Sequence, residues 1–167
     1  MSLSRHARAI GFLPFTVTVL VPVALLALTD PAGIGWGIAW LTLTAGAALV
    51  ATGLALVVWT IGLFGTEGEG TLAPWDPTSR LVVRGPYRYV RNPMILGVCC
   101  IVAGEAVLFG SVAVAAWLAT VAALNAAYMP LVEEPGLEQR FGEDYARYKQ
   151  AVPRWLPRRP GRRSRGT

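Results

Sequence analysis

Four long apolar segments constrain this chain more than any other feature of its sequence. They cover residues 10–29, 36–64, 94–109 and 112–128. Two short turns and one longer polar loop, residues 65–92, separate them. A run of roughly 20 apolar residues can cross a bilayer as a helix. Because the bilayer core offers no hydrogen-bond partners to an open backbone, such spanning segments are helical. The sequence therefore predicts an all-α fold, a polytopic membrane helical bundle of about four transmembrane helices.

The composition agrees with a membrane protein and argues against a disulfide or a metal site. Hydrophobic residues make up 54% of the chain. The mean hydropathy is +0.48, which is high for a soluble domain. Cys99 and Cys100 are adjacent, and neighbours rarely form an unstrained disulfide. His6 is the single histidine, so no metal site is expected.

The positions of the basic residues predict the orientation in the membrane. All 15 lysines and arginines lie before residue 10, between residues 65 and 92, or after residue 128. The turns near Asp30 and Gly110 carry none, so the positive-inside rule places both termini and the 65–92 loop in the cytoplasm. This basic charge indicates contact with membrane lipids and not with nucleic acid. The abundance of alanine, glycine and arginine favours a bacterial cytoplasmic membrane.

Several residues within the apolar segments carry further expectations. Pro14 and Pro22 predict a kink in the first helix. Small residues from Gly46 to Gly53 recur at helical spacing, which favours close packing against another helix over a substrate-lining face. Glu105 is ionisable and lies inside the third segment, so it either has a functional role or reaches the far membrane interface.

The chain after the last apolar segment leaves the membrane. The stretch from Met129 to Pro135 predicts the end of the last span, and residues 136–149 predict a short cytosolic amphipathic helix. The arginine-rich end predicts a disordered basic tail. The expected organisation is an N-terminal two-helix membrane anchor over residues 1–64, a core over residues 65–157 and the tail over residues 158–167.

A polar loop, residues 81–97, concentrates charge and aromatic rings at the mouth of the predicted bundle. Three arginines alternate there with two tyrosines. Gly85-Pro86 predicts a turn, and Pro93 suits the first turn of the helix that follows. Because residues 94–128 form a helical hairpin, the acidic pair Glu133-Glu134 is expected at the same membrane face as this loop.

Such a mouth suits S-adenosyl-L-methionine (SAM) as a ligand. Aromatic faces and carboxylates stabilise its sulfonium cation. Arginine or backbone N–H groups bind its carboxylate, and a carboxylate accepts hydrogen bonds from its ribose. Methyl transfer depends mostly on alignment and a dry site, so no metal is required. Other adenine-containing or anionic ligands satisfy parts of the same requirement.

The residues of this region resemble those of the isoprenylcysteine carboxyl methyltransferase family, which is itself similar to the membrane phospholipid methyltransferases. The similarity runs from about residue 70 to residue 157. It rests on residues 85–94 and then, in order, on Glu133-Glu134, Phe141-Gly142, Tyr145, Tyr148 and Val152-Pro153-Arg154-Trp155.

The resemblance implies an integral membrane, SAM-dependent methyltransferase with a lipophilic acceptor, either isoprenylcysteine carboxylate-like or another small lipid-soluble substrate. It implies that the cofactor is bound by Ser79, Arg80, Leu81, Val82, Tyr87, Asn92, Pro93, Met94, Ile95 and Glu133. Glu134 is the candidate catalytic base, and an acceptor that ionises unaided is the alternative.

Three departures from the family pattern concern catalysis and the acceptor. Asn92 replaces the usual histidine, and an asparagine cannot shuttle protons near neutral pH. Ile95 replaces a frequent tyrosine. Residues 129–132 lack the arginine that the eukaryotic prenylcysteine branch carries before the acidic pair, which puts a prenylcysteine substrate in doubt.

Two other classes of function remain open at this point. A membrane reductase that uses NADPH would share a similar helical end, although NADPH requires more cationic groups for its phosphates. A non-catalytic membrane protein would give more weight to Glu105 and to the small residues of the second apolar segment.

Overall fold

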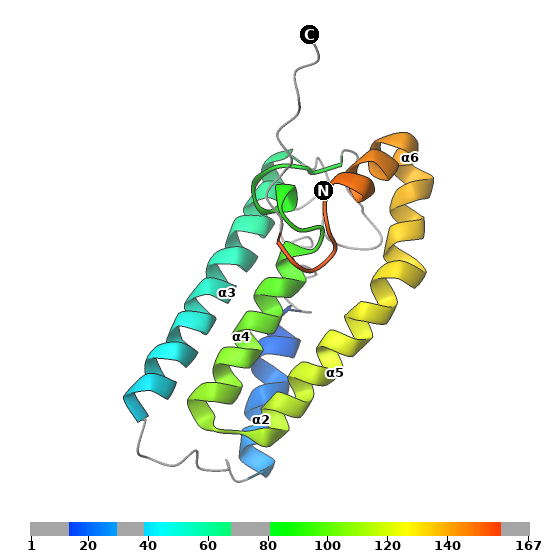
Figure 1. Ribbon diagram of the computed structural model, residues 1–167. Helices are drawn as coiled ribbons and strands as arrows, with labels where there is room; N and C mark the ends of the chain where they lie inside the picture. Colours follow the sequence, from blue (N-terminus) through cyan, green and yellow to red (C-terminus); the bar gives the residue numbers. More distant parts are fainter. Residues whose placement is uncertain (1–13, 30–38, 68–80, 158–167) are drawn as a thin grey trace, which may run out of the picture.

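The computed structural model of the chain describes residues 14–29, 39–67 and 81–157 (Figure 1). These residues are mostly helical and contain no strand, which confirms the predicted all-α fold. The elements in chain order are η1 (Thr16–Leu20), α2 (Val21–Leu28), α3 (Ala39–Glu67), η3 (Gly85–Arg88), α4 (Pro93–Phe109), α5 (Val112–Tyr128), η4 (Met129–Glu133) and α6 (Glu134–Ala151).

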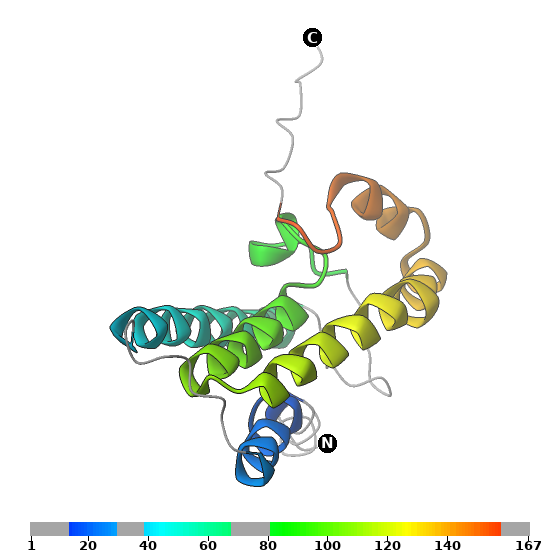
Figure 2. The same ribbon diagram turned by 60° about the horizontal axis from the view of Figure 1, so that its bottom comes forward.

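The four apolar helices α2, α3, α4 and α5 lie side by side as a bundle (Figures 1 and 2). By length and composition, the helices over Trp40–Leu63 and Val112–Ala151 are long enough to cross a membrane. The apolar helices over Thr16–Leu28 and Pro93–Phe109 are shorter. At 17 residues, α4 extends roughly 26 Å, just under the thickness of a bilayer core.

Two pairs of glycines bring α3 and α4 into backbone contact. A Cβ on Gly53 would lie 2.5 Å from the carbonyl oxygen of Gly97, and one on Gly104 would lie 2.7 Å from that of Gly46. Each pair is reciprocal, and the glycines are seven residues apart on both helices. The expected packing role of the Gly46–Gly53 stretch is therefore confirmed, because any side chain there would push the helices apart.

The hairpin between α4 and α5 forms where the sequence predicts it. Gly110 ends α4 with a φ of +60°, a conformation that glycine adopts without strain. Ser111 then caps α5, and its side chain accepts a hydrogen bond from the backbone N–H of Val114 at 3.3 Å.

Each of the two π-helical turns ends two residues before a proline. The segment Thr16–Leu20 precedes Pro22, and Met129–Glu133 precedes Pro135. A proline lacks the N–H donor and its ring collides with the carbonyl four residues earlier, so a wider turn relieves the collision. At the first of these turns, the indole Nε1 of Trp117 donates to the carbonyl oxygen of Val17 at 3.0 Å and so joins the turn to α5.

The helix continues beyond α5 without a break. The stretch from Met129 to Pro135 is predicted to end the last membrane span, and η4 carries the helix through this stretch into α6. The break comes later, at Gly142, whose φ of +52° and ψ of −126° are not helical. The π turn explains why Pro130 and Pro135 do not terminate the helix.

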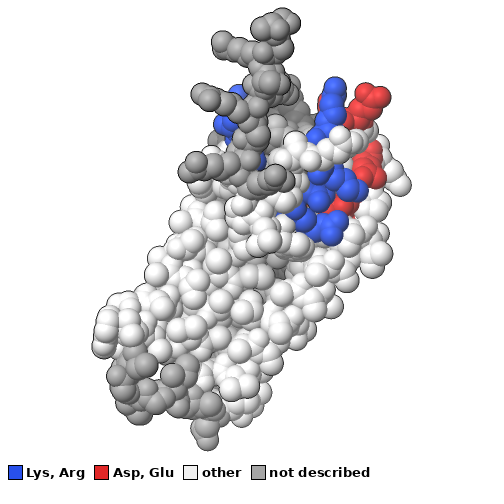
Figure 3. Space-filling view, viewed as in Figure 1, with Lys and Arg blue, Asp and Glu red and all other residues white. Residues whose placement is uncertain are grey.

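Charged side chains gather at one end of the bundle, as Figure 3 shows for one face. This end holds the loop before α4, the helix α6 and the segment that follows it (Figure 1). The exception among the described residues is Glu105, a half-buried side chain within α4 whose Oε2 atom has no hydrogen-bond partner in the described ranges. The bundle therefore presents one polar mouth.

Candidate functional site

The loop before α4 is fixed against the end of α3. Gly85 has a φ of +56°, and a Cβ there would lie 2.8 Å from the side chain of Leu63. The short 3-10 turn that begins at Gly85 is closed by a hydrogen bond of 3.1 Å from the N–H of Tyr87 to the carbonyl oxygen of Arg84. The predicted Gly85-Pro86 turn is thus confirmed, and it holds the Tyr87 side chain inside the protein.

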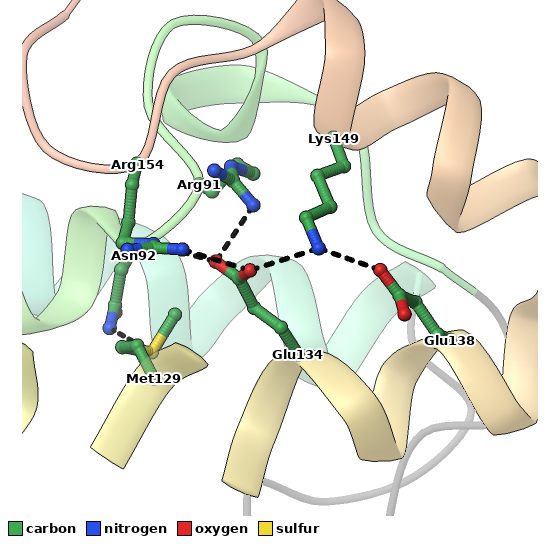
Figure 4. Close-up of polar contacts among 7 residues, drawn as sticks. All are labelled: Arg91, Asn92, Met129, Glu134, Glu138, Lys149 and Arg154. Carbon is green, nitrogen blue, oxygen red and sulfur yellow. Dashed lines mark hydrogen bonds and ion pairs between the residues drawn. The ribbon is translucent and has the colours of Figure 1, made fainter. Parts of the chain in front are cut away.

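Asn92 joins the start of α4 to the end of α5. Its Oδ1 accepts from the N–H of Ile95 at 3.3 Å, which caps α4. Its Nδ2 donates to the sulfur of Met129 at 3.0 Å (Figure 4). Asn92 and Met129 are both buried, so the Asn92 side chain joins α4 to the end of α5 at the mouth of the bundle.

Glu134 is the centre of a buried ionic cluster (Figure 4). Its Oε1 accepts from Nη1 of Arg91 at 2.8 Å and from Nε of Arg154 at 2.7 Å. Its Oε2 accepts from Nη2 of Arg154 at 3.0 Å and lies 3.3 Å from Nζ of Lys149. Lys149 also binds Glu138 at 2.7 Å. One carboxylate thereby ties together the loop, α6 and the segment after α6.

The cluster keeps Glu134 ionised although the residue is only 1% exposed. Burial acts to raise the pKa of its carboxyl. The hydrogen bonds from Arg154 and Lys149, with the charges of Arg91 and Arg154, outweigh burial and lower that pKa. A carboxylate whose oxygens already accept these bonds is a poor general base. The geometry therefore favours a structural role for this side chain.

The segment after Gly142 is fastened to the loop by further bonds. The hydroxyl of Tyr148 donates to the carbonyl oxygen of Tyr87 at 2.7 Å. The N–H of Arg91 donates to the carbonyl oxygen of Pro153 at 2.9 Å. Burial is the main cause that raises the pKa of both Tyr87 and Tyr148, so both phenols stay neutral. The predicted apolar face of α6 includes Tyr145, which is 1% exposed in this contact.

Glu133 lies beside this cluster but outside its ion pairs. The residue is exposed, and no ion pair to it is found among residues 14–29, 39–67 and 81–157. Its carboxyl group is nevertheless surrounded closely enough by protein that burial raises its pKa, and the charge of Glu134 adds to this effect. A carboxylate that is accessible and destabilised as an anion is suited to receive a cation or a hydrogen-bond donor.

The structure brings most of the predicted cofactor residues to this mouth. Val82, Tyr87, Asn92 and Pro93 are buried there, while Leu81 and Ile95 are half-buried. Met94 packs against the apolar core that contains Val57, Val98, Ile101 and Val121. Ser79 and Arg80 lie outside the described residues.

Sequence reasoning missed four residues whose contacts hold the mouth together. It assigned no site role to Arg91, Lys149, Arg154 or Met129, which hold Glu134 and Asn92. A signal for two of them was present, because Arg91 and Arg154 belong to the segments that carry the family resemblance. Only the fold shows that both converge on one carboxylate.

The comparison with family models identifies the class of protein. Residues 41–144, more than half of the 167 residues, match the family described as phospholipid methyltransferase. The chain therefore belongs to this family of membrane methyltransferases, which includes the isoprenylcysteine carboxyl methyltransferase-like proteins. No curated protein and no solved structure matches the chain.

Proposed function

We propose that the chain is an integral membrane methyltransferase that uses SAM and methylates a lipophilic acceptor. The observation that supports this most directly is that the two residues of the acidic pair lie in different environments. Glu134 is buried and bound by cations, whereas Glu133 is exposed beside it at the polar end of an apolar bundle. A polar cofactor can enter from water at this end, and an acceptor can arrive through lipid.

The residues at the mouth fit such a cofactor chemically. Glu133 offers a carboxylate to ribose hydroxyls or to the sulfonium charge. Nε of Arg91 is buried and has no hydrogen-bond partner in the described part of the chain, so a donor for an anionic group is present. Tyr87 and residues 92–95 are proposed to line the pocket, with Leu81-Val82 contributing through backbone groups. Ser79 and Arg80 complete the proposed set.

SAM, when bound, supplies a methyl group activated by its positive sulfur. The chain's contribution is to hold, orient and dehydrate the reacting groups. Asn92 is committed to its cap and to Met129, and it has no titration near neutral pH. Glu134 is held as an anion by its cationic partners. We therefore propose that the acceptor ionises unaided and that neither side chain removes its proton.

We propose that the polar mouth faces the cytoplasm, in a bacterial cytoplasmic membrane. The described lysines and arginines all lie at this end, and the turn at Gly110-Ser111 carries no basic residue. Because SAM is made and kept in the cytosol, this orientation gives the site access to its cofactor. A periplasmic reporter that became active when fused after Thr167 would overturn this orientation.

Transfer of a labelled methyl group tests the function. Membranes that contain the chain are incubated with methyl-tritiated SAM, and the label is followed into the material that organic solvent extracts. We expect label above the level of Glu133→Gln membranes, while Glu143→Gln retains wild-type transfer because Glu143 is exposed on α6 and forms none of the ion pairs of the Glu134 cluster. Equal label in wild-type and Glu133→Gln membranes would contradict the proposal.

A further inference from the structure

The helix α6 contains a sharp turn at Gly142, an exposed residue. The φ of +52° and ψ of −126° interrupt the helix, and residues on either side are helical. Side chains are strained at positive φ, so glycine is the residue for this conformation. A Cβ built on Gly142 would have nothing within 4 Å. The chain therefore turns at a residue that has open space on the side where a side chain would lie.

The chain beyond this turn, residues 143–157, lies back over the loop before α4 (Figures 1 and 2). We call it the strap. Tyr148 binds the carbonyl of Tyr87, and the carbonyl of Pro153 accepts from the N–H of Arg91. Arg154 reaches Glu134 at 2.7 Å. The strap thus covers the part of the loop that carries the proposed cofactor residue Tyr87.

We propose that the strap is a movable cover that pivots at Gly142, and that Glu134 is the positioning residue that holds it closed. In the closed position, Glu134 binds two cations of the strap, Lys149 and Arg154, and one of the loop, Arg91. In the open position, the strap swings away and Tyr87 and Arg91 become accessible. The link between opening and cofactor exchange rests on the proposed function.

The kinds of contact on the two sides of Gly142 support two positions of the strap. On the strap side, the fastening bonds are hydrogen bonds and ion pairs, whose groups water can solvate once the strap has opened. Two apolar side chains of the strap, Tyr145 and Val152, are buried in this contact. The helices α4 and α5 instead share an apolar core, with Val98, Ile101 and Val121 buried in it. Elements held by few apolar contacts open at the lowest free energy.

The role of Gly142 as the pivot can be tested without disturbing side-chain packing. Gly142→Ala adds a methyl group into open space, so its effect comes from the backbone conformation and not from a collision. Gly136→Ala is the matched control, because Gly136 lies in the same helix, also has open space around it and has no positive φ. We expect only Gly142→Ala to favour a straightened α6 and an open strap.

The ionic contact by which Glu134 holds the strap closed can be tested by graded substitutions. Glu134→Gln removes the charge that faces Arg91, Lys149 and Arg154. Arg154→Lys keeps the strap's charge but loses the two-point contact of 2.7 and 3.0 Å with Glu134. Arg147→Gln is the control, because it removes only the exposed pair of Arg147 with Asp144.

The readout is the distance between spin labels on the strap and on the loop. Labels are attached at Gln150→Cys and Arg88→Cys, both exposed positions, in a chain whose native cysteines are replaced by alanine. The purified protein is measured in nanodiscs without added cofactor. This measurement does not depend on SAM binding, so it can succeed even where the proposed function fails.

We expect one short distance to dominate in the wild-type chain and in the Gly136→Ala and Arg147→Gln controls. In Gly142→Ala and Glu134→Gln, a longer distance should become the larger population, with an intermediate share in Arg154→Lys. Where S-adenosylhomocysteine binds, its dissociation from Glu134→Gln should be faster by about tenfold, as expected for a lost charge-assisted hydrogen bond. A short distance retained in folded Gly142→Ala and Arg154→Lys would overturn the proposal.

Discussion

Glu133 and Glu134 are neighbours in sequence but lie in opposite environments. Glu134 is 1% exposed and binds two arginines and a lysine. Glu133 is an exposed residue, although partial burial of its carboxyl group and, to a lesser extent, the charge of Glu134 raise the pKa of that group. One carboxylate therefore holds the mouth of the bundle together, and the other remains available to a ligand.

This division predicts different effects of removing each charge. Glu134→Gln leaves Arg91 buried without its anion, and breaking a buried pair costs about 3–5 kcal/mol of the free energy of unfolding. Glu133→Gln should change that free energy by less than about 0.5 kcal/mol, as is usual for an exposed side chain. Thermal unfolding in detergent measures both variants. Equal loss of stability in the two would show that the acidic pair is not divided in this way.

The ionic cluster also predicts a loss of stability in acid. Its partners lower the pKa of Glu134 in the folded chain, so the stabilisation is fully present above the unfolded value of 4.5. It is lost as the pH falls through the lower, folded pKa, because protonation removes the charge that Arg91 and Arg154 require. Unfolding followed between neutral and strongly acidic pH should show a steeper decline below 4.5 for the wild type than for Glu134→Gln. Parallel curves would argue against the cluster.

The contact between α3 and α4 predicts that Gly53 cannot be enlarged. Gly53→Ala places a methyl group 2.5 Å from the carbonyl oxygen of Gly97, so the helices must separate. Overpacking of this kind costs about 1–3 kcal/mol. Gly62→Ala is the matched control on the same helix, because its Cβ would have nothing within 4 Å, and it should be neutral or slightly stabilising. Similar melting temperatures for both variants would exclude the close contact.

The two hydrogen bonds of the Asn92 side chain can be removed separately, and we expect the two losses to differ. Asn92→Asp keeps the oxygen that caps α4 but loses the donor to Met129, whereas Asn92→Ala loses both. Loss of the cap costs about 1 kcal/mol. Asn92→Ala should therefore unfold at a lower temperature than Asn92→Asp at neutral pH. The reverse order would mean that the contact with Met129 outweighs the cap.

The sequence predicted the helices and their arrangement well, because apolar length and turn residues are local signals. Gly110 and Ser111 mark the α4–α5 hairpin, and the glycine stretch of α3 marks its packing face. The continuation of the helix past Met129–Pro135 was not predicted, because a π turn absorbs Pro135 in a way that proline alone does not reveal. The extent of the three predicted parts of the chain stays a prediction.

The site was predicted less completely than the fold. The acidic pair and the loop could be placed at one membrane face from charge and topology. Which of the two glutamates is buried could not be predicted from the sequence. The burial of Glu134 depends on Arg154, which lies 20 residues further along the chain and is brought back by the turn at Gly142. A contact that depends on such a reversal has no periodic signal in the sequence.

Calorimetric titration of the purified chain with SAM, S-adenosylhomocysteine and NADPH tests the central claim most directly. The account predicts that both SAM forms bind and that NADPH does not. It also predicts that Glu133→Gln weakens SAM binding by about tenfold or more, as expected for a lost charge-assisted hydrogen bond. A folded chain that binds NADPH, or that binds no SAM at all, would contradict the account.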